Sequence, residues 1–495
     1  MTHIRSSVPL GDLLARVSLA GHSDFAGARL DSATADLIIP HVTSDSREVR
    51  EGSLFVAVSG GTQDGHAYAQ EAAQRGAAAV LVERTVEDAG IPAILVKSTR
   101  GALSEVAAAL AGDPGRHMDI SAVTGTNGKT TTAWLIAQAL GSAGQKCGYV
   151  GTIGAGIPGS LEPATHTTPG AVELQNYLAD LLGEGCSAVA LEASSHALDQ
   201  QRIGGFPLKA AVFTNLTRDH LDYHGDEETY FRAKAQLFEN LDPAALCVLN
   251  QDDPAGRRLA ASCNNPVLTY GTEPTSDIQF AIRSDLASGL RLLLDGQAAA
   301  FRLSGFFNAY NLAAAYAALA AYGLTAAERI DALTQAAPAP GRFETHQIGR
   351  DRVAVIDYAH TPDALRNVLK AARRIVPAGA NLWCLFGCGG DRDAGKRPLM
   401  GAIAEEFADR VVVTSDNPRH EDPQAILDDI REGVRQPERQ KWIVDRKEAI
   451  HMCVQSAGLG DVVVVAGKGP EPYQVVGDER RPFLDESEVK AAAGI

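Results

Sequence analysis

The sequence lacks the features of several specialised classes of protein. Its 495 residues contain only seven cysteines, an odd number, and none of them forms a CxxC pair. Cys384 and Cys388 lie near a predicted strand end without a histidine close by, so we expect no zinc-type site there. No apolar run approaches the ~18 residues that a membrane span requires, so we expect no membrane insertion. Scattered cysteines fit a reducing compartment, and we expect a cytoplasmic protein.

The sequence also lacks an excess of positive charge. Lys and Arg number 45 against 61 Asp and Glu, and the net charge at pH 7 is −16. This balance argues against a general nucleic-acid-binding protein, although a local basic pocket can still bind an anionic substrate. The apolar fraction of 45% and the charged fraction of 21% are those of an ordinary globular protein.

Alternating strand and helix patterns divide the chain into three regions. The first has strand patterns at 53–58, 78–82 and 93–96 and a helical pattern at 67–75. The second has a helical pattern at 102–111, apolar strands at 188–191, 210–213 and 246–249, hairpin-like β structure between 278 and 303, and an alanine-rich helix at 311–321. The third follows a hinge-like segment at 336–341 (AAPAPG) and has strands at 353–356, 382–386, 411–413 and 462–465.

This alternation is typical of an α/β fold with parallel sheets covered by helices on both faces. We therefore predict three domains: a small α/β N-terminal domain (1–98), a central parallel-sheet ATPase domain with a phosphate loop (99–340) and a C-terminal Rossmann-like α/β domain (341–495).

The ten residues Val123–Thr132 (VTGTNGKTTT) carry the clearest functional signal. They follow a short apolar strand at 120–123 and lead into a helix that we expect at 133–140. Glycines let backbone N–H groups turn toward a phosphate, and the helix N-terminus favours the anion. Lys129 would reach the terminal phosphates of a nucleotide, and the Thr130 hydroxyl would bind Mg²⁺. The chain is therefore expected to bind a nucleoside triphosphate.

The spacing of this motif departs from the standard phosphate loop. Four residues normally separate the first glycine from the Gly-Lys pair, and Gly125 stands too close to Gly128 for that rule. A chance turn is the alternative, but the strand before it and the helix after it favour a phosphate loop. Thr131 and Thr132 are ambiguous, since they can simply begin the helix.

Polar residues follow two further strands of the central region. Glu192 follows the strand at 188–191, and the run 219–224 (DHLDYH) follows the strand at 210–213. Mg²⁺ prefers hard oxygen ligands, so one carboxylate could hold it together with Thr130 and the nucleotide phosphates. A structural carboxylate is the alternative for Glu192, and a packed or capping histidine is the alternative for His220.

In the third region every strand runs directly into polar or glycine-containing residues. In open α/β sheets, ligands bind beyond the carboxyl ends of the strands. We therefore expect a binding site at this edge of the sheet rather than ordinary solvated loops. The four segments are 357–360 (DYAH), 387–393 (GCGGDRD), 414–419 (TSDNPR) and 466–471 (AGKGPE).

A set of longer motifs, spread over nearly the whole chain, resembles the Mur ligase family in sequence and in order. The matching segments are TGTNGKTTT (124–132), HTTP (166–169), EASSHALDQQRI (192–203), NLTRDHLDYHG (215–225), YFRAKAQLF (230–238), FNAYN (307–311), GRFE (341–344), DYAHTPDAL (357–365), GCGGDRDAGKRPLM (387–400) and DNPRHEDP (416–423).

The resemblance implies an ATP-dependent amide ligase with three domains. The first would hold the UDP end of the substrate, the central one would bind ATP, and the last would carry an amino acid and close over it. The reaction implied joins an amine to the D-glutamate γ-carboxylate of UDP-MurNAc-L-Ala-D-Glu and cleaves ATP to ADP and phosphate. Phosphoryl transfer makes the carboxylate an acyl phosphate, which requires positioning and charge neutralisation rather than a protein nucleophile.

The resemblance also implies the catalytic residues. Lys129 would neutralise phosphate charge, Thr130 and Glu192 would hold one magnesium ion, and His220 would help to hold a second. Lys234 in YFRAKAQLF would be carbamylated by CO₂, which converts a cation into a carboxylate-like metal ligand. Without the motif, an exposed helical lysine would be the default interpretation of Lys234.

Binding residues are implied in three groups, and for the less specific positions a turn-capping polar residue is the alternative. The ATP contacts implied are Gly125, Thr126, Asn127, Gly128, Lys129, Thr130, Thr131, Asn308, Asn311, Arg342 and Asp357, with His360 supporting the same pocket. Contacts to the UDP-MurNAc-dipeptide are implied at Ser44, Ser46, Thr167, Thr168, Ser194, Gln200 and Arg202. Contacts to the amino acid are implied at Arg392, Asp416, Asn417, Pro418, Arg419, Gly467 and Glu471.

The segment DNPR (416–419) bears on which amino acid is added. Family members add meso-diaminopimelate or L-lysine, and only diaminopimelate has a second carboxylate. The planar guanidinium of Arg419 suits bidentate binding of that group, and lysine would leave the guanidinium unpaired. We therefore expect meso-diaminopimelate. One departure is Pro470, which stands where the family usually has histidine and puts the local loop geometry in doubt.

Other interpretations of the sequence make different predictions. An L-lysine-adding homologue, a sibling Mur ligase or a folylpolyglutamate-type ligase would share the ATP site, and DNPR and 43–47 argue against them. A P-loop switch ATPase would hydrolyse nucleotide without an amine, but no strand ends in a convincing Asp-Glu pair. We expect a monomer that acts on small molecules.

Overall fold

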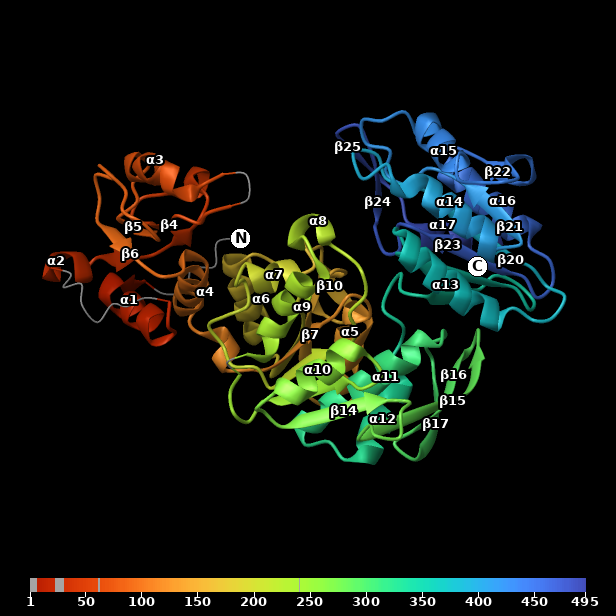
Figure 1. Cartoon of the computed structure of the whole chain (residues 1–495), viewed down its shortest axis with the longest axis horizontal. Helices are drawn as coiled ribbons and strands as arrows, with labels where there is room; N and C mark the ends of the chain where they lie inside the picture. Colours follow the sequence, from red (N-terminus) through yellow and green to blue (C-terminus); the bar gives the residue numbers. More distant parts are fainter. Residues whose placement is uncertain (1–6, 23–30, 61–62, 240) are drawn as a thin grey trace. The chain divides into compact units, whose positions relative to one another are not determined.

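The structure is a computed structural model that describes residues 7–22, 31–60, 63–239 and 241–495. The chain forms two compact units, one of Met1–Asp277 with Ala314–Arg329 and the other of Ile278–Ala313 with Ile330–Ile495. Figure 1 shows the helices and strands coloured along the chain from red to blue. Within the described residues, no helix combines the length and the apolar character needed to cross a membrane.

A parallel sheet forms the N-terminal part of the first unit. It runs in the order β3 (Val42–Thr43), β4 (Leu54–Val56), β5 (Ala79–Val82), β6 (Ala93–Leu95). Leu54 and Val56 face a core shared with α1 (Leu10–Leu19) and α4 (Thr99–Leu110), whereas Phe55 faces a core shared with α3 (Ala69–Gln74). The remaining elements are β1 (Val8–Pro9), α2 (Ser32–Ala35), β2 (Ile38–Ile39), η1 (Ser46–Glu48) and η2 (Gly65–Tyr68).

The three strands and the helix predicted for this region are found, with two differences in detail. The helix expected at 67–75 begins as the 3₁₀ turn η2, because the Asp64 side chain accepts the His66 N–H and fixes a tight first turn. The short strand β3 was not predicted, since two residues are too few to show a period of alternation.

The second sheet of this unit contains the phosphate loop. Its order is β10 (Ser160–Glu162), β9 (Gly154–Ile157), β8 (Cys147–Gly151), β11 (Ala188–Glu192), β7 (Asp119–Thr124), β12 (Ala210–Phe213), β13 (Leu246–Asn250), β14 (Val267–Gly271). From β8 to β14 all neighbours are parallel, and the antiparallel hairpin β9–β10 forms one edge. The central strands are buried on both faces, which explains their continuous apolar runs. The predicted strands 120–123, 188–191, 210–213 and 246–249 are confirmed.

Helices cover this sheet as the alternation predicts. α5 (Lys129–Ser142) contacts β7, β8 and β11, while α6 (Ala171–Gly183) supplies Leu174 and Leu178 to the core that also contains Ile120 and Val189. The other helices here are η3 (Pro114–Arg116), α7 (Ser195–Asp199), α8 (Leu221–His224), α9 (Glu227–Ala235), η4 (Gln236–Phe238) and α10 (Pro254–Ser262).

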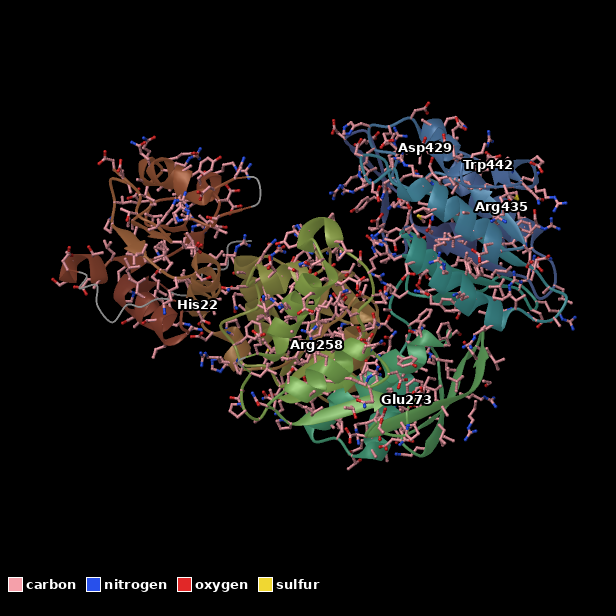
Figure 2. All side chains as sticks on the ribbon, viewed as in Figure 1. His22, Arg258, Glu273, Asp429, Arg435 and Trp442 are labelled. Carbon is pink, nitrogen blue, oxygen red and sulfur yellow. The ribbon has the colours of Figure 1, made fainter. Side chains whose placement is uncertain are left out.

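Helix α9 is fixed to α10 by one arginine. Arg258 of α10 donates to both carboxylate oxygens of Glu228 at 2.6 and 2.8 Å, and its guanidinium lies 4.0 Å from the centre of the Phe231 ring. Figure 2 labels Arg258 among the side chains drawn on the ribbon. Glu228 and Phe231 lie on α9, the helix that carries Lys234. This contact therefore helps to hold α9 in place.

The second unit contains an antiparallel meander and a parallel sheet. The meander comprises β15 (Ile278–Leu286), β16 (Gly289–Leu294) and β17 (Gln297–Phe301), which confirms the hairpin-like β structure expected between 278 and 303. The alanine-rich helix expected at 311–321 is found as α11 (Phe307–Ala318) followed by η5 (Leu319–Tyr322), and α12 (Ala326–Gln335) comes next.

The parallel sheet of the second unit has the order β18 (Glu344–Gln347), β19 (Val353–Asp357), β23 (Val462–Ala466), β20 (Leu382–Phe386), β21 (Arg410–Val413), β22 (Lys441–Trp442). Only β18 is antiparallel to its neighbour. One face packs against α13 (Pro362–Ile375), α14 (Lys396–Phe407) and α15 (Pro423–Arg431), and the other against α16 (Arg446–Ser456) and α17 (Asp485–Ala493). The four strands expected here are confirmed, whereas β18, β22 and the hairpin of β24 (Tyr473–Val476) and β25 (Glu479–Pro482) were not predicted.

Three parallel sheets with helices on both faces confirm the α/β fold class. The exact domain limits, 1–98, 99–340 and 341–495, stay predictions. Because β19, β20, β21 and β23 are mutually parallel, the polar segments that follow them all leave the sheet at one edge, as expected.

Candidate active site

The phosphate loop joins β7 to α5 through two glycines with left-handed backbone. The φ angles are +147° at Gly125 and +84° at Gly128. A Cβ atom at Gly125 would lie 1.9 Å from Thr214 Oγ1, so only glycine fits there. The helix begins at Lys129 rather than at 133, and Thr131 and Thr132 belong to its buried first turn. The short spacing of the motif is thus compatible with a strand, loop and helix arrangement.

Residues after β12 brace this loop from the neighbouring strand. The backbone N–H of Thr126 donates to the Asn215 carbonyl at 2.8 Å, and that of Asn127 donates to Asn215 Oδ1 at 3.0 Å. The Thr214 hydroxyl donates to the Asn127 carbonyl at 2.6 Å. The expected nucleotide contacts from Gly125 to Thr131 are therefore held as one rigid segment.

Two lysines meet at one carbonyl of the loop. Lys129 Nζ donates to the carbonyl oxygens of Gly125 and Thr126 at 2.9 and 2.8 Å, and Lys234 Nζ donates to the same Gly125 oxygen at 2.8 Å. Lys234 is 1% exposed, so the default interpretation of an exposed helical lysine is wrong. Burial, and secondly the charge of Lys129, lower the pKa of the Lys234 amine well below its ordinary value. Both effects therefore favour the neutral form of the Lys234 amine.

Glu192 lies at the carboxyl end of β11, beside β7, and is fully buried. Its carboxylate accepts hydrogen bonds from the Thr130 hydroxyl at 3.0 Å, from the Thr152 N–H at 2.8 Å, from the Thr152 hydroxyl at 3.2 Å and from the Tyr149 hydroxyl. The structure thus brings together the two oxygen-donor residues expected for magnesium. Hydroxyl and carboxylate oxygens suit a hard cation, so these residues fit the ion.

His220 lies in an aromatic cluster next to this group. It adopts a left-handed conformation (φ +51°) before α8, with Nε2 3.6 Å from Asp219 Oδ2. Its ring centre is 4.9 Å from that of His196 and 6.3 Å from that of Tyr230, whose hydroxyl lies 3.2 Å from Thr126 Oγ1. Burial, and then neighbouring cations, lower the pKa of His196 to about 4. His220 is therefore packed against aromatic rings and also keeps part of its imidazole exposed. Its expected role as a metal ligand stays a prediction.

Five of the residues expected to bind the dipeptide form one network around Glu192. The Thr168 hydroxyl donates to the Glu192 carbonyl at 2.7 Å and accepts the Ser194 N–H at 3.0 Å. Arg202 donates to the Thr168 carbonyl at 3.0 Å and to Gln200 Oε1 at 2.6 Å. Thr167 accepts a hydrogen bond from the Thr152 hydroxyl at 3.1 Å.

Ser44 and Ser46 lie apart from this network. They follow β3 in the N-terminal sheet, where Ser44 is exposed and Ser46 begins η1. Their expected role at the uridine end of the substrate stays a prediction.

In the second unit, the carboxyl ends of β21 and β23 join through a buried lysine. Lys468 is fully buried, and its Nζ donates to Asn417 Oδ1 at 3.1 Å and to Glu471 Oε2 at 2.9 Å. Asn417 Nδ2 also donates to Glu471 Oε2 at 2.9 Å. The sequence analysis assigned no role to Lys468. The glycines on either side of it were the one feature of the sequence that could have pointed to this residue.

Asp416 carries an unpaired buried oxygen. Its Oδ1 accepts the Asn417 N–H at 2.8 Å, whereas Oδ2 is buried and accepts no hydrogen bond from the described residues. Such an oxygen costs free energy unless a donor reaches it. Asp416 Oδ2 is therefore a buried acceptor without a donor among the described residues.

Arg419 and Arg392 flank the glycines after β20. Arg419 adopts φ +53° and donates from Nη1 to the Gly390 carbonyl at 2.7 Å. A Cβ atom at Gly389 would lie 2.8 Å from Arg419 Nη1 and 3.8 Å from Arg392 Cγ. Arg419 Nη1 and the Cγ of Arg392 thus approach the same glycine turn.

The loop around Pro470 is closely packed against the GRFE segment. A Cβ atom at Gly341 (φ +62°) would lie 2.4 Å from the Pro470 nitrogen, and the Glu471 N–H donates to the Lys468 carbonyl at 3.1 Å. The backbone nitrogen of residue 470 is packed against Gly341, and proline, which has no N–H, fits there. Glu471 still accepts a hydrogen bond from Asn417.

The expected ATP contacts of this unit fall into two groups. Asn308 donates to the Ser304 carbonyl at 2.7 Å and accepts from Asn311 Nδ2 at 2.8 Å, on the first turns of α11. Asp357 accepts the N–H groups of Phe343 and Ala359 at 2.7 and 2.8 Å. Burial raises the pKa of Asp357 to about 6, against the nearby charge of Arg342.

Arg342 and His360 both contact the turn after β19. The Arg342 guanidinium lies 4.7 Å from the centre of the Tyr358 ring, and His360 Nδ1 lies 2.8 Å from the Tyr358 carbonyl oxygen. Lys396 Nζ donates to the His360 carbonyl at 2.8 Å. The structure therefore brings Arg342, Asp357 and His360 together.

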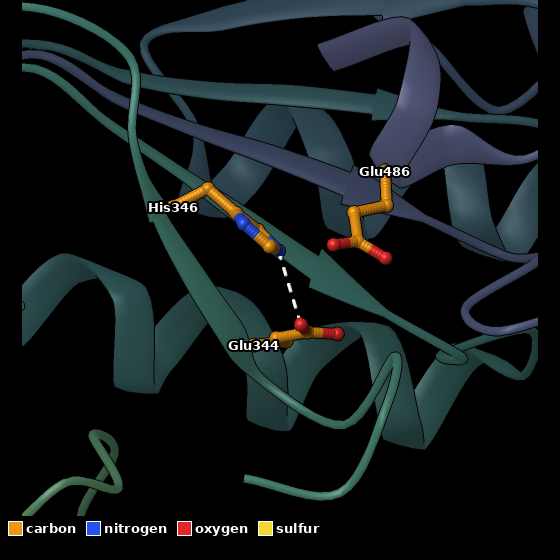
Figure 3. A group of neighbouring side chains, drawn as sticks. All are labelled: Glu344, His346 and Glu486. Carbon is orange, nitrogen blue, oxygen red and sulfur yellow. Dashed lines mark ion pairs between the residues drawn. The ribbon is translucent and has the colours of Figure 1, made fainter. Parts of the chain in front are cut away.

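A trio of ligand-type side chains lies elsewhere in this unit, at the edge strand β18 (Figure 3). Among the described residues, Glu344, His346 and Glu486 place one ligand atom each within 4.8 Å of one another. Glu344 also accepts the Gly341 N–H at 2.8 Å, and Glu486 accepts from Lys490 Nζ at 2.5 Å. We interpret the trio as a polar group that helps to fix the loop of Arg342 through the hydrogen bond from Gly341 to Glu344.

Comparisons with known proteins agree with this geometry. The chain matches the models of the Mur ligase middle domain over residues 123–319, of the Mur ligase glutamate ligase domain over 341–469, and of the Mur ligase family catalytic domain over 38–110. It is 46% identical to the UDP-N-acetylmuramoyl-L-alanyl-D-glutamate–2,6-diaminopimelate ligase of Pseudomonas aeruginosa, over 93% of this chain and 96% of the relative. It is 43% identical to the ligase of the same name from Geobacillus thermodenitrificans, over 90% and 93% of the two chains.

Solved structures lead to the same family. A structure of a UDP-N-acetylmuramoyl-L-alanyl-D-glutamate–2,6-diaminopimelate ligase is 36% identical, covers 99% of both chains and has a TM-score of 0.72. MurF from Acinetobacter baumannii, at 18% identity over 99% of both chains and a TM-score of 0.60, shares the fold. With three family models and relatives matched over nearly its full length, the chain belongs to the Mur ligase family.

Proposed function

We propose that this protein is an ATP-dependent ligase that adds meso-diaminopimelate to the D-glutamate γ-carboxylate of UDP-MurNAc-L-Ala-D-Glu, in peptidoglycan precursor synthesis. The identity of 41–46% to curated ligases of that name, over 90% or more of the chain, supports the activity. The arginine beside Gly389, Arg419, supports the choice of amino acid, because its guanidinium suits the second carboxylate that lysine lacks. ATP would be cleaved to ADP and phosphate.

The chemistry follows from the residues at the phosphate loop. The D-glutamate γ-carboxylate oxygen attacks the terminal phosphorus of ATP, the bond to the bridging oxygen breaks, and ADP leaves. The backbone N–H groups of the loop and Lys129 stabilise the charge that develops on the phosphate oxygens. Thr130 and Glu192 would hold Mg²⁺, which would neutralise phosphate charge when bound. The product of this step is an acyl phosphate.

The second step uses the strand-end residues of the other unit. The neutral amino group of diaminopimelate attacks the acyl carbon, the bond from this carbon to the phosphate oxygen breaks, and inorganic phosphate leaves. The nitrogen gives up a proton and becomes an amide. Asp416 and Glu471 would hold the amino group at the other end of the amino acid, and Arg419 and Arg392 would hold its carboxylates.

We also propose that Lys234 is carbamylated by CO₂. Carbamate formation requires an unprotonated amine, and the lowered pKa of buried Lys234 favours that form. The nitrogen attacks the carbon of CO₂ and loses a proton to water, and the negative charge comes to lie on the two carbamate oxygens. The carbamate would balance the charge of Lys129 and, together with His220, would help to hold a second Mg²⁺.

L-Lysine is the alternative amino acid, and a switch ATPase is the alternative class. Lysine would leave Arg419 without a carboxylate, whereas a switch would need neither the Asp416 oxygen nor the dipeptide network around Glu192. We further propose that the enzyme acts in the cytoplasm as a monomer, which size-exclusion chromatography with light scattering would test.

Phosphate release in the presence of each substrate combination is the direct test of this function. We expect release only when ATP, UDP-MurNAc-L-Ala-D-Glu and meso-diaminopimelate are all present. With ¹⁸O in the D-glutamate carboxylate, one labelled oxygen should appear in the phosphate. Release without the amino acid at the same rate, or unlabelled phosphate, would contradict the proposed reaction.

A further inference from the structure

A fully buried ion pair lies behind the strand ends that we assign to the amino acid. Arg446, the first residue of α16, donates from Nε and Nη2 to the two carboxylate oxygens of Asp485, the first residue of α17, both at 2.7 Å. Neither side chain is exposed. Isolated charges at such a place are costly, and a buried pair requires further hydrogen bonds to offset desolvation.

Among the described residues, Arg446 also donates to two strand-end carbonyls that lie next to the proposed amino-acid site. Nη2 donates to the carbonyl of Ala466, the last residue of β23, at 3.0 Å. Nη1 donates to the carbonyl of Ser415, just after β21, at 3.3 Å. Each carbonyl directly precedes a residue of the site, Gly467 in one case and Asp416 in the other.

These two loops touch each other at the unpaired oxygen. A Cβ atom at Gly467 (φ +116°) would lie 2.5 Å from Asp416 Oδ2, so the two loops are closely packed at this point. The charge of Arg446 also acts on Asp416 and Glu471. One guanidinium therefore links the two loops and lies within electrostatic reach of Asp416 and Glu471.

We infer that Arg446, held by Asp485, is a positioning residue for the incoming diamino acid. It fixes the loops after β21 and β23 so that Asp416 and Glu471 bind the distal ammonium group. This inference rests on the proposed function. A positioning role predicts that changes at Arg446 alter the KM of one substrate out of three. An ion pair that only stabilises the fold would not have this selective effect.

Steady-state kinetics of Arg446→Lys and Asp485→Asn test the inference. Lysine retains the charge but cannot donate to Asp485 and to both carbonyls in the fork geometry. We expect the KM for diaminopimelate to rise at least tenfold, while the KM values for ATP and for UDP-MurNAc-L-Ala-D-Glu change less than twofold. Asp485→Asn keeps the shape of the side chain and should shift the same KM in the same direction.

The matched control is Glu488→Gln. Glu488 joins the same two helices, through Lys447 at 3.4 Å and His451 at 3.0 Å, but its partners do not reach the strand ends. This variant should leave all three KM values within twofold. Equal rises of all three KM values in Arg446→Lys, or an unchanged diaminopimelate KM in either folded variant, would overturn the inference.

A stability measurement keeps the result interpretable. Thermal unfolding identifies the temperature at which each variant is folded, and the kinetics are then measured below it, with Asp485→Asn as the milder change. If wild-type protein does not use diaminopimelate, the proposed function fails. If wild-type protein uses it and the variants show no selective KM change, only the positioning role fails.

Discussion

Replacing Arg419 by alanine should weaken the use of meso-diaminopimelate far more than that of L-lysine. The guanidinium is anchored by one hydrogen bond to the Gly390 carbonyl and retains donors for a second carboxylate. Lysine has no carboxylate at that end, so it gains nothing from Arg419. The left-handed backbone of Arg419 (φ +53°) is equally unfavourable for alanine, so the substitution does not release strain.

The expected loss of kcat/KM in Arg419→Ala follows from the partial burial of the Arg419 side chain. Truncating one partner of a buried charge pair costs about 2–5 kcal/mol. Because Arg419 is only half-buried, solvent screens the pair, and we take the lower end. About 2 kcal/mol corresponds to a roughly 30-fold loss in kcat/KM. Arg419→Lys keeps a charge without the planar fork and should fall between alanine and wild type.

The assay measures kcat/KM for both amino acids by phosphate release at saturating ATP and UDP-MurNAc-L-Ala-D-Glu. We expect the diaminopimelate-to-lysine ratio to fall by roughly 30-fold in Arg419→Ala. A loss of equal size for both amino acids would refute the reasoning, because it would show that Arg419 acts on the fold or on the shared reaction.

Three further predictions concern the loop, the buried lysine and a buried carboxyl group. Gly125→Ala forces a Cβ to 1.9 Å from Thr214 Oγ1, so it should lower the melting temperature by several degrees and raise the KM for ATP, whereas Gly141→Ala in α5, where nothing lies within 4 Å, should not. With ¹³C-bicarbonate, NMR should show a carbamate carbon that is absent in Lys234→Arg, and removal of CO₂ should lower activity reversibly. The pKa of Asp357 is raised to about 6 in the folded protein against about 3.9 unfolded, so its contribution to stability is present below pH ~4 and is lost as pH rises through ~6. In wild-type protein this should lower the free energy of unfolding by about 3 kcal/mol between pH 4 and 7, and Asp357→Asn should abolish that decrease. Urea unfolding over this pH range measures the difference.

The outcomes that contradict these predictions are distinct. Equal effects of the two glycine substitutions would show that space at Gly125 is not limiting. A carbamate signal that persists in Lys234→Arg would place the modification on another residue. A parallel pH dependence of stability in Asp357→Asn and wild type would show that another group titrates.

Much of the fold was predictable because parallel strands buried on both faces have unmistakable apolar runs. The strands 188–191, 210–213 and 382–386 were predicted to within one residue of their observed bounds. Three strands that were missed, β3, β22 and β24, are short or half-exposed, so their pairing depends on partners distant in the sequence. The buried strand β8 was also missed, because Gly148 and Gly151 interrupt its apolar run.

The sequence by itself determined the α/β class, the phosphate loop and the family, because these depend on local periodicity and on motifs of consecutive residues. Only the tertiary structure decided which groups share an environment. It placed Lys234 in the interior against Gly125, made Lys468 the link between Asn417 and Glu471, and put the Arg446–Asp485 pair behind two strand ends. Burial and desolvation arise from residues distant along the chain, so no local pattern could show that these three cations are buried.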